Sequence, residues 1–208
     1  GLGDVYKRQV IDNLTSLRGG LFGTVCQNAV IKNVGVASGE IGKENTYTSF
    51  LGGIAKWSNG ADFINCWNGA DIYGSGYMGG IVGTVRDGGK SNITGCYNVG
   101  SLYASSGHTG GIVGHLDTTR RDTSVEVTID NCYNLGNING IYSLGGIVGQ
   151  AQDGHTIVNC YNAGKITSAS DGQAGAIAGS LTNDNRVEEC YYDSSVCLLY
   201  TSPSPRDI

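Results

Sequence analysis

Five of the seven cysteines recur at intervals of about 30 residues, and thiols are the side chains here best suited to metal binding or disulfide chemistry. They are Cys66, Cys96, Cys132, Cys160 and Cys190. A zinc site usually needs a Cys-x-x-Cys pair or a histidine at ligand spacing, and the sequence has neither. The spacing therefore favours a structural column of small apolar side chains, with no metal and no cofactor. Disulfides between neighbouring repeats stay open as an alternative, and Cys26 stands outside the series.

Histidine, serine and carboxylate side chains offer acid–base and nucleophilic chemistry, but their positions do not recur. His108, His115 and His155 stand near glycines or at motif edges, which predicts solvated loop residues. A β-helical polysaccharide lyase or hydrolase would group its acidic residues on one face of successive coils. The acidic residues here fall at different places in the chain, and no nucleophile elbow surrounds any serine. We therefore expect no catalytic residues and no enzyme activity.

The elements that carry these residues are repeats. A glycine pair followed by an aliphatic pair, usually with a third glycine, occurs six times at intervals of 27 to 35 residues. The copies begin at Gly19, Gly52, Gly79, Gly110, Gly145 and Gly175. Lys56 and Ala176 stand where other copies have glycine, which puts the local turn geometry in question at both places. Repeats of this length bury their apolar faces against one another, which favours a solenoid.

A second motif of the form Ile-x-Asn-Cys-Tyr-Asn follows each glycine motif. Its apolar runs are short, β-branched or aromatic, and bounded by glycine or asparagine, which indicates strands rather than helices. We predict an all-β fold, a parallel β-helix of about six coils with about three short strands per coil. Stacked coils would place Cys inward, Tyr outward, and the asparagines in a column at a corner. These asparagines are Asn68, Asn98, Asn134 and Asn162.

The sequences at the two ends of the chain are predicted to derive from a sequencing adapter rather than from the natural protein. When residues 4–9 are reverse-translated, the reverse complement of that DNA, shifted by one base, encodes residues 197–201. The shared string resembles a transposon-type sequencing-library adapter. We therefore assign residues 1–9 and 197–208 to adapter and residues 10–196 to the solenoid. Its six repeats are predicted at about residues 14–40, 47–74, 75–105, 106–141, 142–169 and 170–193.

Composition narrows the class of partner. The formal net charge is −5 and the basic residues are scattered, which argues against nucleic-acid binding. No apolar run approaches the roughly 20 residues that cross a bilayer, so we expect no membrane insertion by this segment. Glycine is abundant at 35 residues but follows no Gly-X-Y period, which excludes collagen.

The paired motifs, such as Gly110-Gly111-Ile112-Val113-Gly114 with Asn131-Cys132-Tyr133-Asn134, resemble the GLUG-motif repeats of large surface-exposed bacterial proteins, including IgA-specific metallopeptidases and adhesin-like proteins. The resemblance covers about residues 14–193. It implies a β-solenoid outside any catalytic module, and an extracellular, secreted or wall-attached location on a bacterium. It also implies further repeats or domains in the same parent chain. The motif has no family-wide catalytic residues, so none are carried over.

The segments that vary between repeats are candidates for binding. The connection between half-motifs is longest at residues 116–127, with Arg120, Arg121, Asp122 and Glu126 as a predicted binding loop, and a tolerated insertion is the alternative. Residues 44–49, with Tyr47, are a second candidate. We predict a non-catalytic segment that acts as a rigid spacer and as an adhesion surface for host protein or glycan. The alternative is an accessory β-helix of a larger secreted peptidase or polysaccharide-active enzyme.

Overall fold

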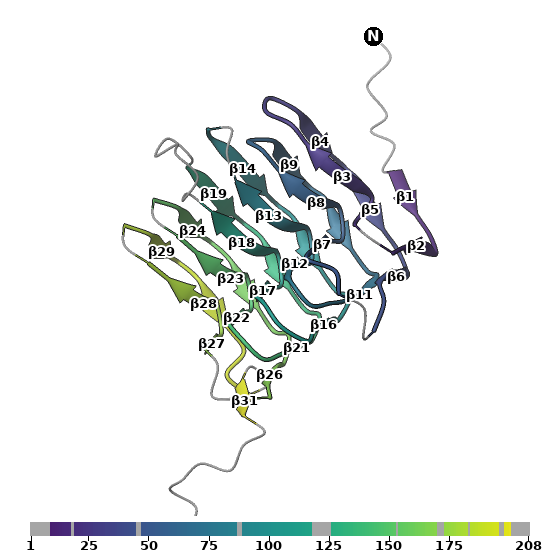
Figure 1. Ribbon diagram of the computed structural model, residues 1–208. Helices are drawn as coiled ribbons and strands as arrows, with labels where there is room; N and C mark the ends of the chain where they lie inside the picture. Colours follow the sequence, from purple (N-terminus) through teal and green to yellow (C-terminus); the bar gives the residue numbers. More distant parts are fainter. Residues whose placement is uncertain are drawn as a thin grey trace, which may run out of the picture.

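The structure, a computed structural model, describes residues 9–17, 19–44, 47–86, 89–117, 126–152, 154–169, 173–182 and 184–195, and the backbone of 198–200. Within these residues every secondary-structure element is a β-strand. The strands form five sheets, and neighbouring strands pair in parallel. In Figure 1 the chain advances coil by coil from the purple N-terminal end to the yellow C-terminal end, with corresponding strands side by side. The predicted all-β parallel solenoid is confirmed.

The five sheets are named here in the order in which each coil passes through them. The first sheet contains β7 (Phe50–Gly52), β12 (Tyr77–Gly79), β17 (Thr109–Gly110), β22 (Leu144–Gly145) and β27 (Ala174–Gly175). The second contains β3 (Phe22–Val25), β8 (Ala55–Ser58), β13 (Val82–Arg86), β18 (Val113–Asp117), β23 (Val148–Ala151) and β28 (Ala178–Leu181). The third contains β4 (Val30–Lys32), β9 (Asp62–Ile64), β14 (Ser91–Thr94), β19 (Val127–Asp130), β24 (Thr156–Val158) and β29 (Arg186–Glu188).

The fourth and fifth sheets complete each coil. The fourth contains β1 (Gln9–Ile11), β5 (Val34–Val36), β10 (Trp67–Asn68), β15 (Tyr97–Asn98), β20 (Tyr133–Asn134), β25 (Tyr161–Asn162) and β30 (Tyr191–Tyr192). The fifth contains β2 (Leu14–Ser16), β6 (Gly39–Gly42), β11 (Asp71–Gly74), β16 (Leu102–Ala104), β21 (Ile138–Gly140), β26 (Ile166–Ser168) and β31 (Leu198–Tyr200). β31 lies in the flank that the sequence assigns to adapter and pairs with β26. Five coils, from β7 to β31, have a strand in every sheet.

The prediction of about three strands per coil was wrong, since a complete coil has one strand in each of the five sheets. Two motifs that were predicted as single strands each bend in the middle and form two strands. The glycine motif divides into a strand of the first sheet and one of the second, as in β12 and β13. The Ile-x-Asn-Cys-Tyr motif divides at the residue before cysteine, which has a positive φ. This angle is 52° at Asn65, 63° at Gly95 and 54° at both Asn131 and Asn159. Asparagine and glycine are the residues that enter this left-handed region at least cost.

The glycine motif brings the first two sheets into backbone contact. A Cβ added at Gly79 would overlap the carbonyl oxygen of Val82, and a Cβ at Gly114 would lie 2.6 Å from the backbone nitrogen of Met78. No side chain larger than hydrogen fits between these strands. The aliphatic residues beside the glycines turn inward instead, where Ile81, Val82 and Ile112 are fully buried.

Columns of apolar side chains fill the space between the sheets. In the fifth sheet Ile41, Ile72, Leu102, Ile138 and Ile166 stand in register. In the third sheet Phe63, Ile93, Ile129 and Ile157 do the same. These side chains are almost completely buried, and they form one continuous hydrophobic core along the coil axis. Within the described residues, no helix is long and apolar enough to cross a bilayer.

Candidate binding site

The recurring cysteines lie in one column inside the corner between the third and fourth sheets. Cys66, Cys96, Cys132 and Cys160 are buried, and Cys190, in the last coil, is partly exposed. Successive members contact directly, since the backbone N–H of Cys66 donates to Sγ of Cys96 at 3.4 Å and that of Cys96 to Sγ of Cys132 at 3.4 Å. All of these thiols, and the exposed Cys26, are free. No group of metal-binding side chains is found among the described residues.

Each buried thiol is held by backbone carbonyls. The Sγ of Cys132 lies 3.3 Å from the carbonyl oxygens of both Ile93 and Asp130. Burial away from water raises the pKa of the Cys132 thiol well above its ordinary value. The Cys132 thiol is therefore neutral and shielded from solvent, and it packs inside the corner.

The four predicted asparagines form a second column of fully buried side chains. The Nδ2 of Asn98 donates to Oδ1 of Asn134 at 2.9 Å and to the carbonyl oxygen of Gly100 at 2.8 Å. Asn68 donates in the same way to Asn98, and Asn134 to Asn162, each at 2.9 Å. These amides satisfy the turn that follows each strand of the fourth sheet, so they are part of the scaffold.

The aromatic residues next to the cysteines point outward. The rings of Tyr97 and Tyr133 stack with 4.8 Å between centroids, and those of Trp67 and Tyr97 with 5.7 Å. The column continues at Tyr161 and Tyr191, which are exposed. Alternation along the strand places cysteine and aromatic side chains on opposite faces.

Most of the predicted binding loop lies outside the described residues. Arg120, Arg121 and Asp122 belong to that part of the chain. Glu126 is described, is exposed, and pairs with Lys90 at 2.9 Å. An exposed ion pair of this kind contributes little to stability.

The prediction that all three histidines are solvated was wrong. His115 and His155 are buried, and His108 is half-buried. His115 packs against Tyr77 with 4.5 Å between ring centroids and against His108 with 5.5 Å. Burial lowers the pKa of His115 from 6.5 to about 4, although Asp117 acts in the opposite direction. His108 and His115 fill the wedge between the first two sheets, beyond the point where glycines bring the sheets together. His155 precedes β24 of the third sheet, and its Nδ1 accepts from the backbone N–H of Val127 at 3.2 Å.

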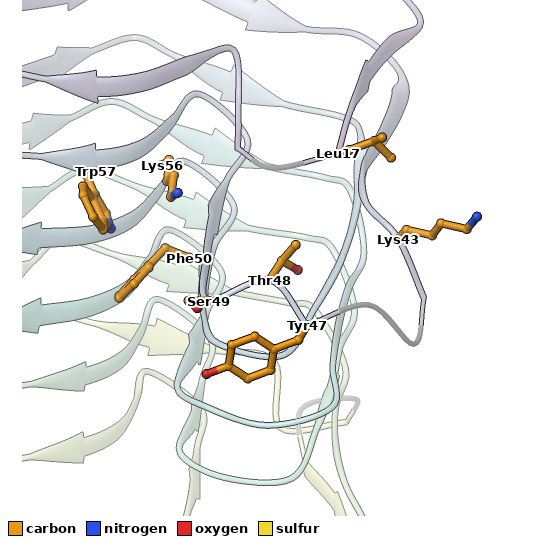
Figure 2. Close-up of a pocket in the computed structure, with 8 residues that line it drawn as sticks. All are labelled: Leu17, Lys43, Tyr47, Thr48, Ser49, Phe50, Lys56 and Trp57. Atoms are coloured by element: carbon orange, nitrogen blue, oxygen red, sulfur yellow. The ribbon is translucent and has the colours of Figure 1, made fainter.

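A groove opens at the N-terminal end of this wedge, and we call it the Trp57 groove. It has a volume of about 500 Å³ and is lined by Leu17, Lys43, Tyr47, Thr48, Ser49, Phe50, Lys56 and Trp57. Phe50 begins β7 in the first sheet, whereas Lys56 and Trp57 belong to β8 in the second. Figure 2 shows Phe50 and Trp57 on one side, Leu17 and Lys43 on the other, and the Tyr47 ring below. The volume is in the range of small-ligand sites.

The groove lies at the edge of the first sheet, as far as the described residues define that sheet. That sheet ends at β7, whereas the second sheet continues to β8 and then β3. In the next coil, a Cβ at Gly83 would lie 2.6 Å from the carbonyl oxygen of Leu51 in β7. Lys56 occupies the position that corresponds to Gly83. Its side chain forms part of the groove wall beside the Trp57 ring.

The aromatic wall of the groove is held by its own neighbours. The Phe50 and Trp57 rings meet edge to face with centroids 5.1 Å apart, and Phe50 meets Tyr77 at 5.3 Å. The Lys56 ammonium lies 5.0 Å from the Trp57 ring centroid, and the Arg86 guanidinium lies 4.0 Å from it. Contacts of this kind fix the indole in place. The Tyr47 ring is 82% exposed and is available to a ligand.

A second hollow, of about 550 Å³, lies on the fifth sheet. Tyr73 and Tyr103 stack within it with centroids 4.7 Å apart, and Asn139 continues the row in the next coil. The stacked faces cover one another, so the ring edges and hydroxyls are what this hollow presents. It offers no basic side chain, since its lining includes Glu44 but neither lysine nor arginine.

The sequence analysis predicted one residue of the groove as a binding candidate and did not predict its aromatic wall. Tyr47 falls within residues 44–49, a segment predicted as a binding candidate. Phe50 and Trp57 carried no signal, because each occupies a repeat position whose residue changes from coil to coil. Trp57 corresponds to Thr84, His115 and Gln150 in later coils. The one available signal was Lys56, where glycine is lost from an otherwise regular motif.

Comparisons with known proteins agree with the fold. No family model matches the chain. Halomucin of Haloquadratum walsbyi is 26% identical over 110 residues, which is 50% of this chain and only 1% of halomucin. A crystal structure titled as that of a putative immunoglobulin A1 protease from Bacteroides ovatus matches with a TM-score of 0.58 and 21% identity, over 90% of this chain and 68% of that chain. The chain is thus a repeat protein with a β-solenoid fold similar to that of the Bacteroides ovatus protein.

Proposed function

We propose that this chain is a non-catalytic segment of a larger surface or secreted bacterial protein, which acts as a rigid spacer and binds glycans in the Trp57 groove. The observation that carries the proposal is the groove itself, in which an exposed tyrosine, Phe50 and Trp57 meet on a solenoid fixed by continuous side-chain columns. Aromatic rings bury the apolar faces of sugars, and a hydroxyl such as that of Ser49 hydrogen-bonds to sugar hydroxyls.

The spacer role is supported by the side chains that hold the coils together. The asparagine and cysteine columns bond each coil to the next, and backbone ladders run through all five sheets. A repeat stack of this kind transmits position along its axis with little bending. It can therefore hold a binding groove at a defined distance from the rest of a parent chain.

The surface or secreted setting is supported by the two similar proteins. Their names, a putative immunoglobulin A1 protease and halomucin, favour this setting. The residues that line the groove are suited to holding a ligand, because they combine aromatic rings with hydroxyl and ammonium groups.

The proposal is tested by applying the full chain to a glycan array and repeating the assay with Tyr47→Ala. We expect one class of glycan to bind, and we expect the substitution to weaken that binding. Tyr142→Ala is the matched control, because Tyr142 is also exposed and does not line the groove. An array without any bound glycan would overturn the glycan-binding role, as would equal binding by the wild-type protein and Tyr47→Ala.

A further inference from the structure

The Trp57 groove differs in charge from the chain as a whole. The chain carries a formal net charge of −5, yet among the described residues the charged side chains that line the groove are two lysines, Lys43 and Lys56, whereas Glu44 lines the second hollow. Two lysines at opposite sides of one hollow, with the Lys43 side chain extending outward in Figure 2, give this part of an acidic protein a positive local potential, which attracts anions.

Neither lysine forms an ion pair with any described residue. The ion pairs of the described chain are Lys90 with Glu126 and Arg186 with Glu188, both far from the groove in sequence. Lys56 instead rests over the face of Trp57, and Lys43 is exposed on the opposite side of the groove in Figure 2. Both charges are thus available to a ligand.

We propose that the Trp57 groove binds an acidic saccharide. Lys56 pairs with one anionic group of the saccharide, and Lys43, on the opposite side of the groove, pairs with another. The rings of Tyr47 and Phe50 pack on its C–H face, and the Ser49 hydroxyl bonds to its hydroxyls. The inference rests on the proposed function and names the ligand class of the same site. A sugar fits better than an acidic peptide, because extended peptides are recognised along a sheet edge or a long groove and this hollow is short.

The test measures the affinity of the full chain for three oligosaccharides by isothermal titration calorimetry. They are a carboxylated galacturonate trimer, a sulfated heparin fragment, and a neutral galactose trimer. We expect at least one acidic ligand to bind about tenfold more tightly than the neutral one, with an affinity that falls as salt rises. Comparison of the two acidic ligands shows which anion the lysines prefer.

The variant Lys43→Gln/Lys56→Gln should lose about tenfold in affinity for the acidic ligand and bind the neutral ligand unchanged. Its matched control is Lys32→Gln/Lys165→Gln, which removes the same charge at exposed lysines outside the groove. Circular dichroism establishes that both variants are folded.

Three results would overturn the inference. Equal binding of neutral and acidic sugars, unaffected by the lysine changes, leaves the proposed function standing and removes the acidic class. Lysine-dependent binding of hexaglutamate in place of any saccharide shows a peptide site. An absence of saccharide binding in every arm removes the inference and the glycan-binding function together.

Discussion

The side-chain amide of Asn98 lies directly over that of Asn134, with Nδ2 of the former 2.9 Å from Oδ1 of the latter. The same Nδ2 also donates to the Gly100 carbonyl at 2.8 Å, while Oδ1 of Asn98 accepts from Asn68 at 2.9 Å. The amide is fully buried and takes part in bonds on both sides. One side chain therefore links three successive coils.

Replacement of Asn98 by alanine should lower the free energy of unfolding by about 2–4 kcal/mol, because it leaves the buried partner groups of two neighbouring coils unsatisfied. Urea unfolding followed by circular dichroism measures the loss. Asn92→Ala is the control, since Asn92 is exposed and its side chain bonds only to Asp62. Equal losses in the two variants would show that the column contributes nothing beyond an ordinary surface contact.

The glycines of the first motif should differ sharply in their tolerance of alanine. Gly79→Ala places a Cβ on the Val82 carbonyl and 2.8 Å from the Gly114 backbone nitrogen, so we expect no folded protein. Gly23→Ala meets no atom within 4 Å and should leave stability unchanged or slightly raised. Soluble yield and thermal unfolding compare the two. A folded Gly79→Ala protein would contradict the close contact of the first two sheets.

Stability should fall as pH drops from about 6.5 to about 4. The pKa of His115 is about 4 in the folded protein and about 6.5 in an unfolded chain, so the unfolded state binds the proton first as pH falls. Neutral, buried His115 contributes its full stabilisation above this pH window. Below the window the free energy of unfolding is lower by at most about 3 kcal/mol. Urea unfolding at about pH 7 and about pH 4.5 measures the change.

The matched variant for this effect is His115→Gln, which carries the residue found at the next position of the same row, Gln150. Its stability should depend less on pH over the same interval. Identical pH dependence in the wild-type protein and the variant would assign the effect to other groups, among them the half-buried His108, whose pKa is also lowered by burial.

Thiol reactivity should divide the cysteines by their position. Cys26 is exposed and should react rapidly with a maleimide in the native protein. Cys66, Cys96, Cys132 and Cys160 are buried and should react only after unfolding in urea. Peptide mapping by mass spectrometry identifies the modified residues. Rapid native labelling of Cys132 would contradict a closed column.

The scaffold could be predicted from the sequence because its stabilising residues repeat. When one residue type returns at one place in every unit, as with Asn98 and Asn134, stacking is the arrangement that uses all copies alike. The number of strands could not be predicted in the same way. The corners at Asn65 and Gly95 depend on a left-handed backbone angle, and the sequence pattern around them still reads as a continuous strand.

The groove could not be predicted because it results from a departure from the repeat. Its aromatic residues, Phe50 and Trp57, occupy repeat positions that hold Tyr77 and Thr84 in the next coil, so no single motif contains them. His115 was misread for a related reason. The equivalent positions in the two preceding coils hold Trp57 and Thr84, so the repeat pattern does not indicate that His115 is buried. The burial of His115 follows from its place in the wedge between the first two sheets.

The in-register columns also shape how this molecule can evolve. Because each coil places a side chain over its equivalent, an unequal crossover that duplicates or deletes one whole unit leaves every column continuous. Such an event changes the length of the rod by about 4.8 Å while its cross-section stays the same. Reach is then adjusted through copy number and ligand choice through point substitutions at one irregular coil, so selection can act on the two properties independently.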